Sequence, residues 1–157
     1  MRKNSMTLLG AAVLASGIFY VVNNPDMFTA SILSLQEQEF IAEKGWDIAY
    51  KTNSGYVDIF MAENMETPEN IDFMISFDKD TVTIDPANLS GQGTRTYSNP
   101  DENNIIITSI PTNIIKSESL IMLPFTGDIE DILLSEAVVD GEWLSIGSLN
   151  EIISHSK

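Results

Sequence analysis

The stretch from Ile71 to Ile84, IDFMISFDKDTVTI, decides the fold class of this chain. In its first half hydrophobic residues occupy every second position, which is the pattern of a strand with one buried face. A charged turn, Asp78-Lys79-Asp80, interrupts the pattern, and a shorter alternation follows before Asp85-Pro86. The stretch therefore predicts two strands joined by a tight turn. The side chains expected to face the core are Ile71, Phe73, Ile75 and Phe77.

Further short strand signals, separated by turn residues such as Asn53-Ser54-Gly55 and Asp140-Gly141, occur on both sides of this stretch. They lie within 46–50, 56–62, 105–107, 120–125, 128–139 and 143–146. This spacing predicts a mainly β fold over residues 46–150, an antiparallel β-sandwich of the jelly-roll kind. Pro124 indicates an edge strand or a bulge. The polar stretch 88–104 is expected to be a long exposed connection.

The N-terminal part of the chain predicts a hydrophobic helix. Arg2 and Lys3 precede Met6 to Val22, MTLLGAAVLASGIFYVV, which carries no charge. A basic flank before an apolar run places the N-terminus in the cytoplasm and the rest of the chain outside it. The length of the run leaves two hypotheses for residues 1–25, a retained transmembrane anchor or a cleavable signal peptide.

A second helix is expected between Asp26 and Lys44, whole or broken, in a helical linker over residues 26–45. Ser34 and Glu37 fit a capping box, and Gly45 suits the position just past the helix end. Its partial apolar stripe comprises Phe28, Ile32, Leu35, Phe40 and Ile41. This helix either carries the domain away from the membrane or packs onto the sandwich. Residues 151–157 are expected to form a C-terminal tail.

Composition excludes several functions. The chain has 8 basic and 23 acidic residues, and from Asp26 onward its net charge is −17. Such a domain repels nucleic acid and anionic membrane surfaces. Without cysteine it has no disulfide, no thiolate nucleophile and no cysteine-bound metal. The one histidine, His155, lies in the tail, so no enzyme activity is predicted.

Binding residues are predicted at three places. Arg95 is the only basic residue of the stretch 88–104 and Tyr97 its only aromatic one, so the two are expected to form a small contact patch. Tyr97 with Trp46 and Trp143 could form a platform for a sugar, although core packing of the two tryptophans is the simpler interpretation.

The third place is a calcium site, because calcium binds carboxylate oxygens. The candidate ligands are Asp78, Asp80 and Asp85, with Asp128, Glu130 and Asp131 as a second group. Neither group matches the EF-hand loop, and solvated acids in turns are the competing interpretation. No other cofactor is expected.

Residues from Trp46 to about Ser148 resemble the cohesin family and related carbohydrate-binding modules. The segments that carry the resemblance are GYVDIFMA, IDFMISFDKDTVTI, NNIIITSI and SLIMLPFTGDIEDILLSEAVVDGEW. The resemblance implies a cohesin-like β-sandwich that binds a protein partner, since cohesins bind a calcium-bearing module called dockerin. A carbohydrate ligand is the other function it implies. No individual contact residue is implied, because no sharp motif marks one.

The N-terminal segment RKNSMTLLGAAVLASGIFYVVNNP resembles a type IV pilin leader and first helix. Gly10 stands where most pilins have the glutamate that pairs with a neighbouring subunit, which puts that pairing in doubt. The sequence thus leads to one hypothesis and one alternative. The hypothesis is a membrane-anchored, extracytoplasmic binding module at a bacterial cell surface, with a dockerin-like protein, a second copy or a carbohydrate as its partner. The alternative is a pilin-like filament subunit.

Overall fold

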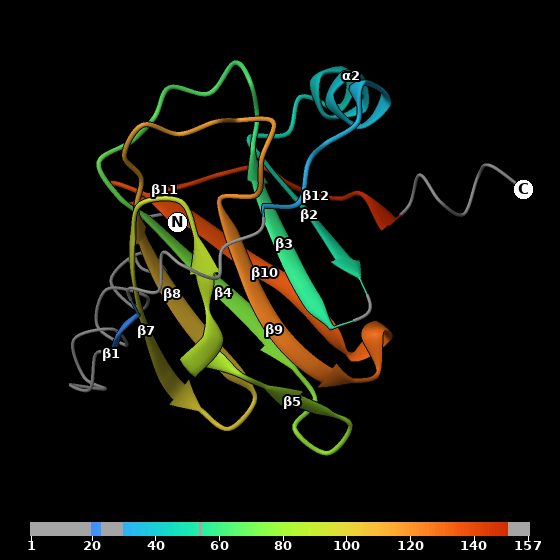
Figure 1. The fold of residues 1–157 in the computed structure, drawn as a ribbon, viewed down its shortest axis with the longest axis vertical. Coiled ribbons are helices and arrows are strands. Elements are labelled where there is room, and N and C mark those ends of the chain that lie inside the picture. Colours follow the sequence, from blue (N-terminus) through green and yellow to red (C-terminus); the bar gives the residue numbers. More distant parts are fainter. Residues whose placement is uncertain (1–19, 23–29, 54, 151–157) are drawn as a thin grey trace, which may run out of the picture.

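Two six-stranded sheets face each other in the computed structural model, which describes residues 20–22, 30–53 and 55–150 (Figure 1). Sheet I has the strand order β1-β7-β8-β4-β10-β11. Sheet II has the order β12-β2-β3-β9-β5, and β6 also pairs with β9. The strands are β1 (Tyr20–Val22), β2 (Ile48–Asn53), β3 (Tyr56–Met61), β4 (Ile71–Phe77), β5 (Val82–Ile84), β6 (Ser90–Gly91), β7 (Thr94–Asp101), β8 (Asn104–Ile110), β9 (Ile121–Gly127), β10 (Ile132–Val139), β11 (Glu142–Trp143) and β12 (Ile146–Ser148).

The predicted β-sandwich is confirmed. Every described pairing of neighbouring strands is antiparallel except that of β12 with β2, which is parallel. Two short 3-10 helices, Pro86–Asn88 and Ile129–Asp131, lie in the connections after β5 and before β10.

Strand β4 lies in the interior of sheet I, between β8 and β10. Ile71, Phe73 and Ile75 are 0% exposed and point into the core between the sheets, as the alternation predicts. Phe77 lies on the same face but is only partly buried. The turn after it closes with a hydrogen bond from the Val82 amide to the Asp78 carbonyl, 2.8 Å long. Because β5 pairs in sheet II, this turn carries the chain from one sheet to the other.

Helix α2 (Leu35–Lys44) begins and ends where its capping residues predict. The Ser34 hydroxyl accepts from the Glu37 amide, and the Glu37 carboxylate accepts from the Ser34 amide at 2.7 Å, so the capping box is confirmed. Gly45 follows the helix with φ 67°, the left-handed conformation that glycine adopts without steric cost. The segment before Ser34 is extended instead, because Ile32 bridges to Glu118 and the Leu33 amide donates to the Ser117 carbonyl.

Helix α2 packs on the outer face of sheet II and adds a third layer to the molecule (Figure 1). Its contact with the sheet forms a second, smaller core. The buried members of that core are Leu33, Ile41, Ala49, Phe60, Ala62 and Leu149. Of the two interpretations drawn from the sequence, the helix packed onto the sandwich is therefore the one observed.

The expectation of a long exposed connection over residues 88–104 is wrong. This stretch forms β6 and β7, and β7 pairs with β8 along much of its length. The prediction failed because a strand needs few apolar residues when only one of its faces is buried. The buried residues of β7 are Arg95, Tyr97 and Ser98, and of these only Tyr97 is hydrophobic.

Pro124 does not mark an edge strand, since β9 lies between β3 and β5 in sheet II. On one side of β9 the pairing partner changes along the strand from β6 to β5, and Pro124 lies at that change. Its lack of an amide hydrogen therefore falls where no strand pairing is interrupted.

The Asp140-Gly141 turn between β10 and β11 is confirmed. Both residues have positive φ, 48° and 80°, as a type I′ hairpin turn requires.

The N-terminal prediction lies largely outside the described residues. Of the apolar run 6–22, only its last three residues are described, and they form strand β1 on the edge of β7, not a helix. The physical reason is that Tyr-Val-Val favours a strand and β7 offers it an edge. Among the described residues, no helix has the length and apolar character needed to cross a bilayer. The tail 151–157 also lies outside them.

Candidate binding surface

Arg95 and Tyr97 do not form an exposed patch. Both lie in β7 with their side chains turned inward, and they are 3% and 9% exposed. The Arg95 guanidinium donates from Nη1 to the carbonyls of Gly91 and Gly93, the latter at 2.7 Å. Burial lowers the pKa of Arg95 from its ordinary value. The arrangement gives Arg95 a structural role, in which it holds the turn between β6 and β7.

Asp78 and Asp80 of the first group of candidate calcium ligands lie in a turn that contacts the segment of the second group, since the Asp78 amide donates to the Asp131 carbonyl at 3.0 Å and the Asp128 amide to the Thr81 carbonyl at 3.2 Å. The carboxylates there serve as turn and cap residues. The Asp78 carboxylate accepts from the Asp80 amide at 2.9 Å, and Asp128 accepts from the Glu130 amide at 3.1 Å. Asp131 accepts from the Thr81 hydroxyl at 2.6 Å. Asp85 lies elsewhere and accepts from the Asn88 side chain at 2.8 Å. In the part of the chain that the structure describes, no three acidic or histidine side chains are grouped to hold a metal ion.

A platform of Tyr97 and the two tryptophans is not assembled. Tyr97 faces the main core, whereas Trp46 lies in the second core, edge-on to Phe40 with ring centroids 5.4 Å apart. Trp143 is 40% exposed on the short edge strand β11, so the expectation that it packs in a core is wrong. Among the described strands β11 pairs with β10 alone and lies at the edge of sheet I.

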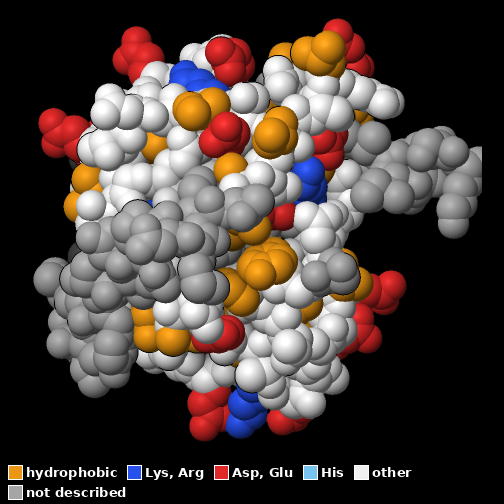
Figure 2. All heavy atoms as spheres, in the orientation of Figure 1, with side chains coloured by type: hydrophobic (Ala, Val, Ile, Leu, Met, Phe, Trp, Pro, Cys, Tyr) orange, Lys and Arg blue, Asp and Glu red, His pale blue; other side chains and the backbone are white. Residues whose placement is uncertain are grey.

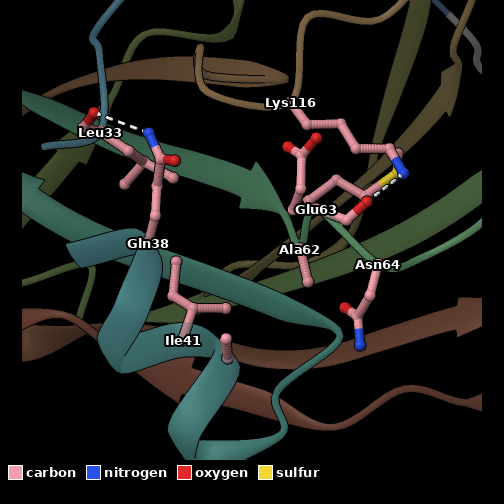
Figure 3. A pocket seen from close by; sticks show the side chains of 9 residues that line it. Leu33, Gln38, Ile41, Ala62, Glu63, Asn64 and Lys116 are labelled. Carbon is pink, nitrogen blue, oxygen red and sulfur yellow. Dashed lines mark hydrogen bonds between the residues drawn. The ribbon is translucent and has the colours of Figure 1, made fainter. Parts of the chain in front are cut away.

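A pocket lies between α2 and the end of β3 (Figure 3). Its volume is about 200 Å³, and its lining is mostly apolar. Gln38 and Ile41 project from α2 on one side, while Glu63, Asn64 and Lys116 stand on the other (Figure 3). We call this hollow the α2 pocket; its lining residues are Leu33, Gln38, Ile41, Ala42, Met61, Ala62, Glu63, Asn64 and Lys116.

Packing explains why the α2 pocket exists. Ile41 and Leu33 fill the space between the helix and sheet II, but Ala42 and Ala62, one on each wall, have only a methyl group. Two small residues on facing walls leave room that a larger pair would close. The Gln38 side chain closes one end by donating to the Leu33 carbonyl at 3.2 Å.

Lys116 builds the opposite wall of the pocket. Its ammonium donates to the carbonyl of Glu63 at 2.8 Å and also to that of Met65. These bonds tie the connection before β9 to the turn after β3, which are distant in sequence. Because both acceptors are backbone carbonyls, Lys116 supports the rim without neutralising a carboxylate.

Three exposed apolar residues lie close in sequence to residues that line the α2 pocket. Ile32 is 66% exposed, Leu35 78% and Ile115 52%. Each adjoins a lining residue: Ile32 precedes Leu33, Ile115 precedes Lys116, and Leu35 is three positions before Gln38 on the same face of α2. Hydrophobic side chains show at the surface over α2, beside acidic ones (Figure 2). The pocket and these three residues together form the candidate binding surface.

The sequence carries only a faint signal for this surface. Ile32, Leu35 and Ile41 belong to the apolar stripe expected in the second helix, but the stripe does not tell which members are buried. In the structure Ile41 is 3% exposed, whereas Leu35 is 78% exposed. The wall formed by Met61 to Asn64 and Lys116 has no sequence signal, because these residues meet only in the fold.

Asp58 is an acidic residue with a buried side chain. It lies in β3, is 1% exposed, and accepts one hydrogen bond from the Asn53 side chain at 2.6 Å. Its other carboxylate oxygen has no hydrogen-bond partner among the described residues. Burial raises the pKa of Asp58, and the Asn53 hydrogen bond, the Lys51 charge and the nearby Ser31 side chain each offset part of that rise.

The strand order, the helical layer and the lateral pocket define this chain as a mainly β domain of the sandwich class. Among solved structures it is similar to the non-cellulosomal cohesin from the hyperthermophilic archaeon Archaeoglobus fulgidus. The identity is 15%, the TM-score is 0.40, and the alignment covers 70% of this chain and 97% of that chain. No protein-family model and no curated protein matches the chain. The fold is therefore assigned from its own strand order and pairing.

Proposed function

We propose that this chain is an extracytoplasmic module that binds a protein partner, and that the apolar residues preceding β1, from Met6 onward, hold it to the membrane. The observation that supports partner binding is the candidate binding surface, where Ile32, Leu35 and Ile115 are exposed and lie close in sequence to residues that line an apolar pocket. Exposed apolar side chains gathered in one area of a water-facing domain are typical of interaction sites. Binding is favoured over catalysis because carboxylates of the two candidate groups, such as Asp78 and Asp128, accept from backbone amides of their own turns.

The location rests on sequence alone. Arg2 and Lys3 before an uncharged run of apolar residues favour a membrane segment with the domain outside the cytoplasm. The same run supports the alternative, a pilin-like filament in which the partner is a second copy of the chain. A carbohydrate ligand has less support, because Trp46 and Tyr97 are packed in the two cores.

In-cell photo-crosslinking tests the proposal. A photoreactive amino acid replaces Leu35 or Ile115 in the native organism, and Ala87, an exposed residue beside β5, serves as the matched control position. We expect a crosslink to one partner protein from Leu35 and Ile115 and none from Ala87. A crosslink to a second copy would favour the filament, and equal yields from all three positions would refute a specific surface.

Protease treatment of intact cells tests the location. An extracytoplasmic domain is expected to be degraded, or to become degradable once the outer layers of the envelope are opened, while cytoplasmic markers stay intact. Full protection until the cytoplasmic membrane is lysed would refute the proposed orientation.

A further inference from the structure

The α2 pocket has the size of one apolar side chain. Its volume of about 200 Å³ exceeds the roughly 150 Å³ of an engineered apolar cavity that binds benzene. Its walls of Leu33, Ile41, Met61 and the two alanines offer dispersion contacts and no charge at the base. An inserted leucine, methionine or phenylalanine would fill it.

The surroundings of the pocket are acidic. The three segments that border it, residues 30–45, 61–69 and 111–119, contain seven acids and two lysines, a net charge of −5. In the described part of the chain the ion pairs are Lys51 with Glu37 and Lys79 with Glu102. For the other six acids of the border, including Glu39, Glu63 and Glu118, the structure shows no ion pair with Lys44, Lys51, Lys79 or Lys116 of the described residues.

The cations of the described part are already engaged. Lys44 lies 5.2 Å from the centroid of the Phe40 ring, and Lys116 is bound to two carbonyls. The Asn64 side chain and the carboxylate of Glu63 make no hydrogen bond to another described residue, so they can accept from a partner. The lining itself contains one acid, Glu63, and one base, Lys116, whose ammonium is held by two carbonyls. A mouth with spare acceptors, bordered by segments of net negative charge, favours a donor-rich, cationic occupant.

We propose that the α2 pocket receives a single large apolar side chain from a basic segment of a protein partner. This inference rests on the proposed function and names the chemistry of its partner. The apolar side chain supplies the buried anchor, and lysines or arginines on either side of it pair with the acids of the rim. Such pairs guide encounter and orientation, and they weaken as salt is added.

Three synthetic peptides of thirteen residues test the proposal. The first carries a central leucine between lysine-rich flanks, the second has glutamates in place of the lysines, and the third has alanine in place of the leucine. Each is titrated into the full chain at low salt, in a nanodisc of zwitterionic lipid where the chain does not stay soluble alone. Methyl NMR signals of Ala42 and Ala62 report binding at the pocket.

We expect the leucine peptide with lysine flanks to shift both alanine signals. Its affinity should exceed that of the alanine peptide by about tenfold or more, the effect of burying one large aliphatic side chain. The glutamate peptide should bind more weakly still. Equal binding by all three peptides, no binding by any, or shifts confined to another surface would overturn the proposal.

Two variants test separately the contribution of the apolar side chain in the pocket and that of the acidic rim. Ala42→Phe fills the pocket from an exposed helical position and should reduce affinity for the leucine peptide about tenfold; its matched control is Ala87→Phe. Glu63→Lys reverses one charge at the rim and should weaken binding about two- to fivefold; its matched control is Glu142→Lys on β11. Circular dichroism confirms that each variant is folded.

The outcomes also separate this inference from the proposed function. If the peptides fail but Leu35 still crosslinks to a partner in cells, the module binds protein and the basic-anchor chemistry is wrong. If the crosslink fails as well, both proposals are wrong. If Ala42→Phe and Ala87→Phe bind the leucine peptide equally well, the pocket is not the site.

Discussion

The sharpest structural prediction concerns Gly147 in β12. Its Cα faces the indole of Trp46, and a Cβ added there would lie 1.8 Å from Cδ2 and 2.0 Å from Cε2 and Cε3 of that ring. Real contacts of a Cβ are never so short. The φ angle of Gly147 is not in the left-handed region, so alanine can adopt the backbone. Gly147→Ala is therefore a purely steric perturbation.

The clash is expected to cost about 1–3 kcal/mol of unfolding free energy, as overpacking of a well-filled core does. Trp46 cannot move freely, because it is wedged edge-on against Phe40 of α2 at an interplanar angle of 80°. Displacing the indole therefore pushes on the helix that forms one wall of the α2 pocket. For a chain of this size, the same cost corresponds to a fall in Tm of about 2–12 °C.

Urea denaturation of the full chain, followed by circular dichroism, measures this cost. Ser148→Ala, at the neighbouring position, is the control and should change stability by less than about 0.5 kcal/mol. In a Trp46→Leu background Gly147→Ala should cost far less, because the ring it strikes is gone, which gives a coupling of about 1 kcal/mol or more. Equal losses in the two backgrounds would refute the steric reasoning.

Three other predictions follow from single side chains. Phe73 is fully buried, so Phe73→Ala should lower the free energy of unfolding by about 3–5 kcal/mol in the same urea assay. Phe77 is only partly buried, so Phe77→Ala should lower it clearly less, and equal losses would contradict this difference in burial. Ser34→Ala should cost about 1 kcal/mol by removing the helix cap, with loss of far-UV helical signal on heating as the check. Because burial raises the pKa of Asp58, its charged form destabilises the fold as pH rises. Asp58→Asn should therefore be more stable than the natural chain at pH 7, with the gap closing below the carboxyl's ordinary pKa of 3.8; a less stable variant at pH 7 would refute this.

The elements that the sequence predicted well are those whose signals are local. The alternation from Ile71 to Phe77 identified β4 and its buried face, because a strand places every second side chain on one side. The capping residues Ser34, Glu37 and Gly45 match the ends of α2, because capping bonds join residues three to five positions apart. The helix expected from Asp26 began too early, since the chain before Ser34 is extended. Asp140-Gly141 identified a hairpin for the same reason.

Stretch 88–104 shows where local signals failed. Its polar composition indicated a loop, but the edge of β8 supplies pairing partners that make it a strand. In β7 the side chains of Arg95 and Tyr97 point inward and are buried. The two residues predicted to form an exposed contact patch therefore belong to the interior. Whether a polar stretch pairs depends on the edge available to it, which no window of sequence contains.

The sequence alone determined the sandwich class, the turn chemistry, the acidity and the uncharged N-terminal run, because each is a property of neighbouring residues or of composition. The tertiary structure decided the candidate binding surface. Residues from 32 to 42, from 61 to 64 and from 115 to 116 meet there only after α2 docks on sheet II and Lys116 binds the carbonyls of Glu63 and Met65. A pocket is the space left by side chains distant in sequence, so its position and size are set by packing between elements and not by the pattern within any of them.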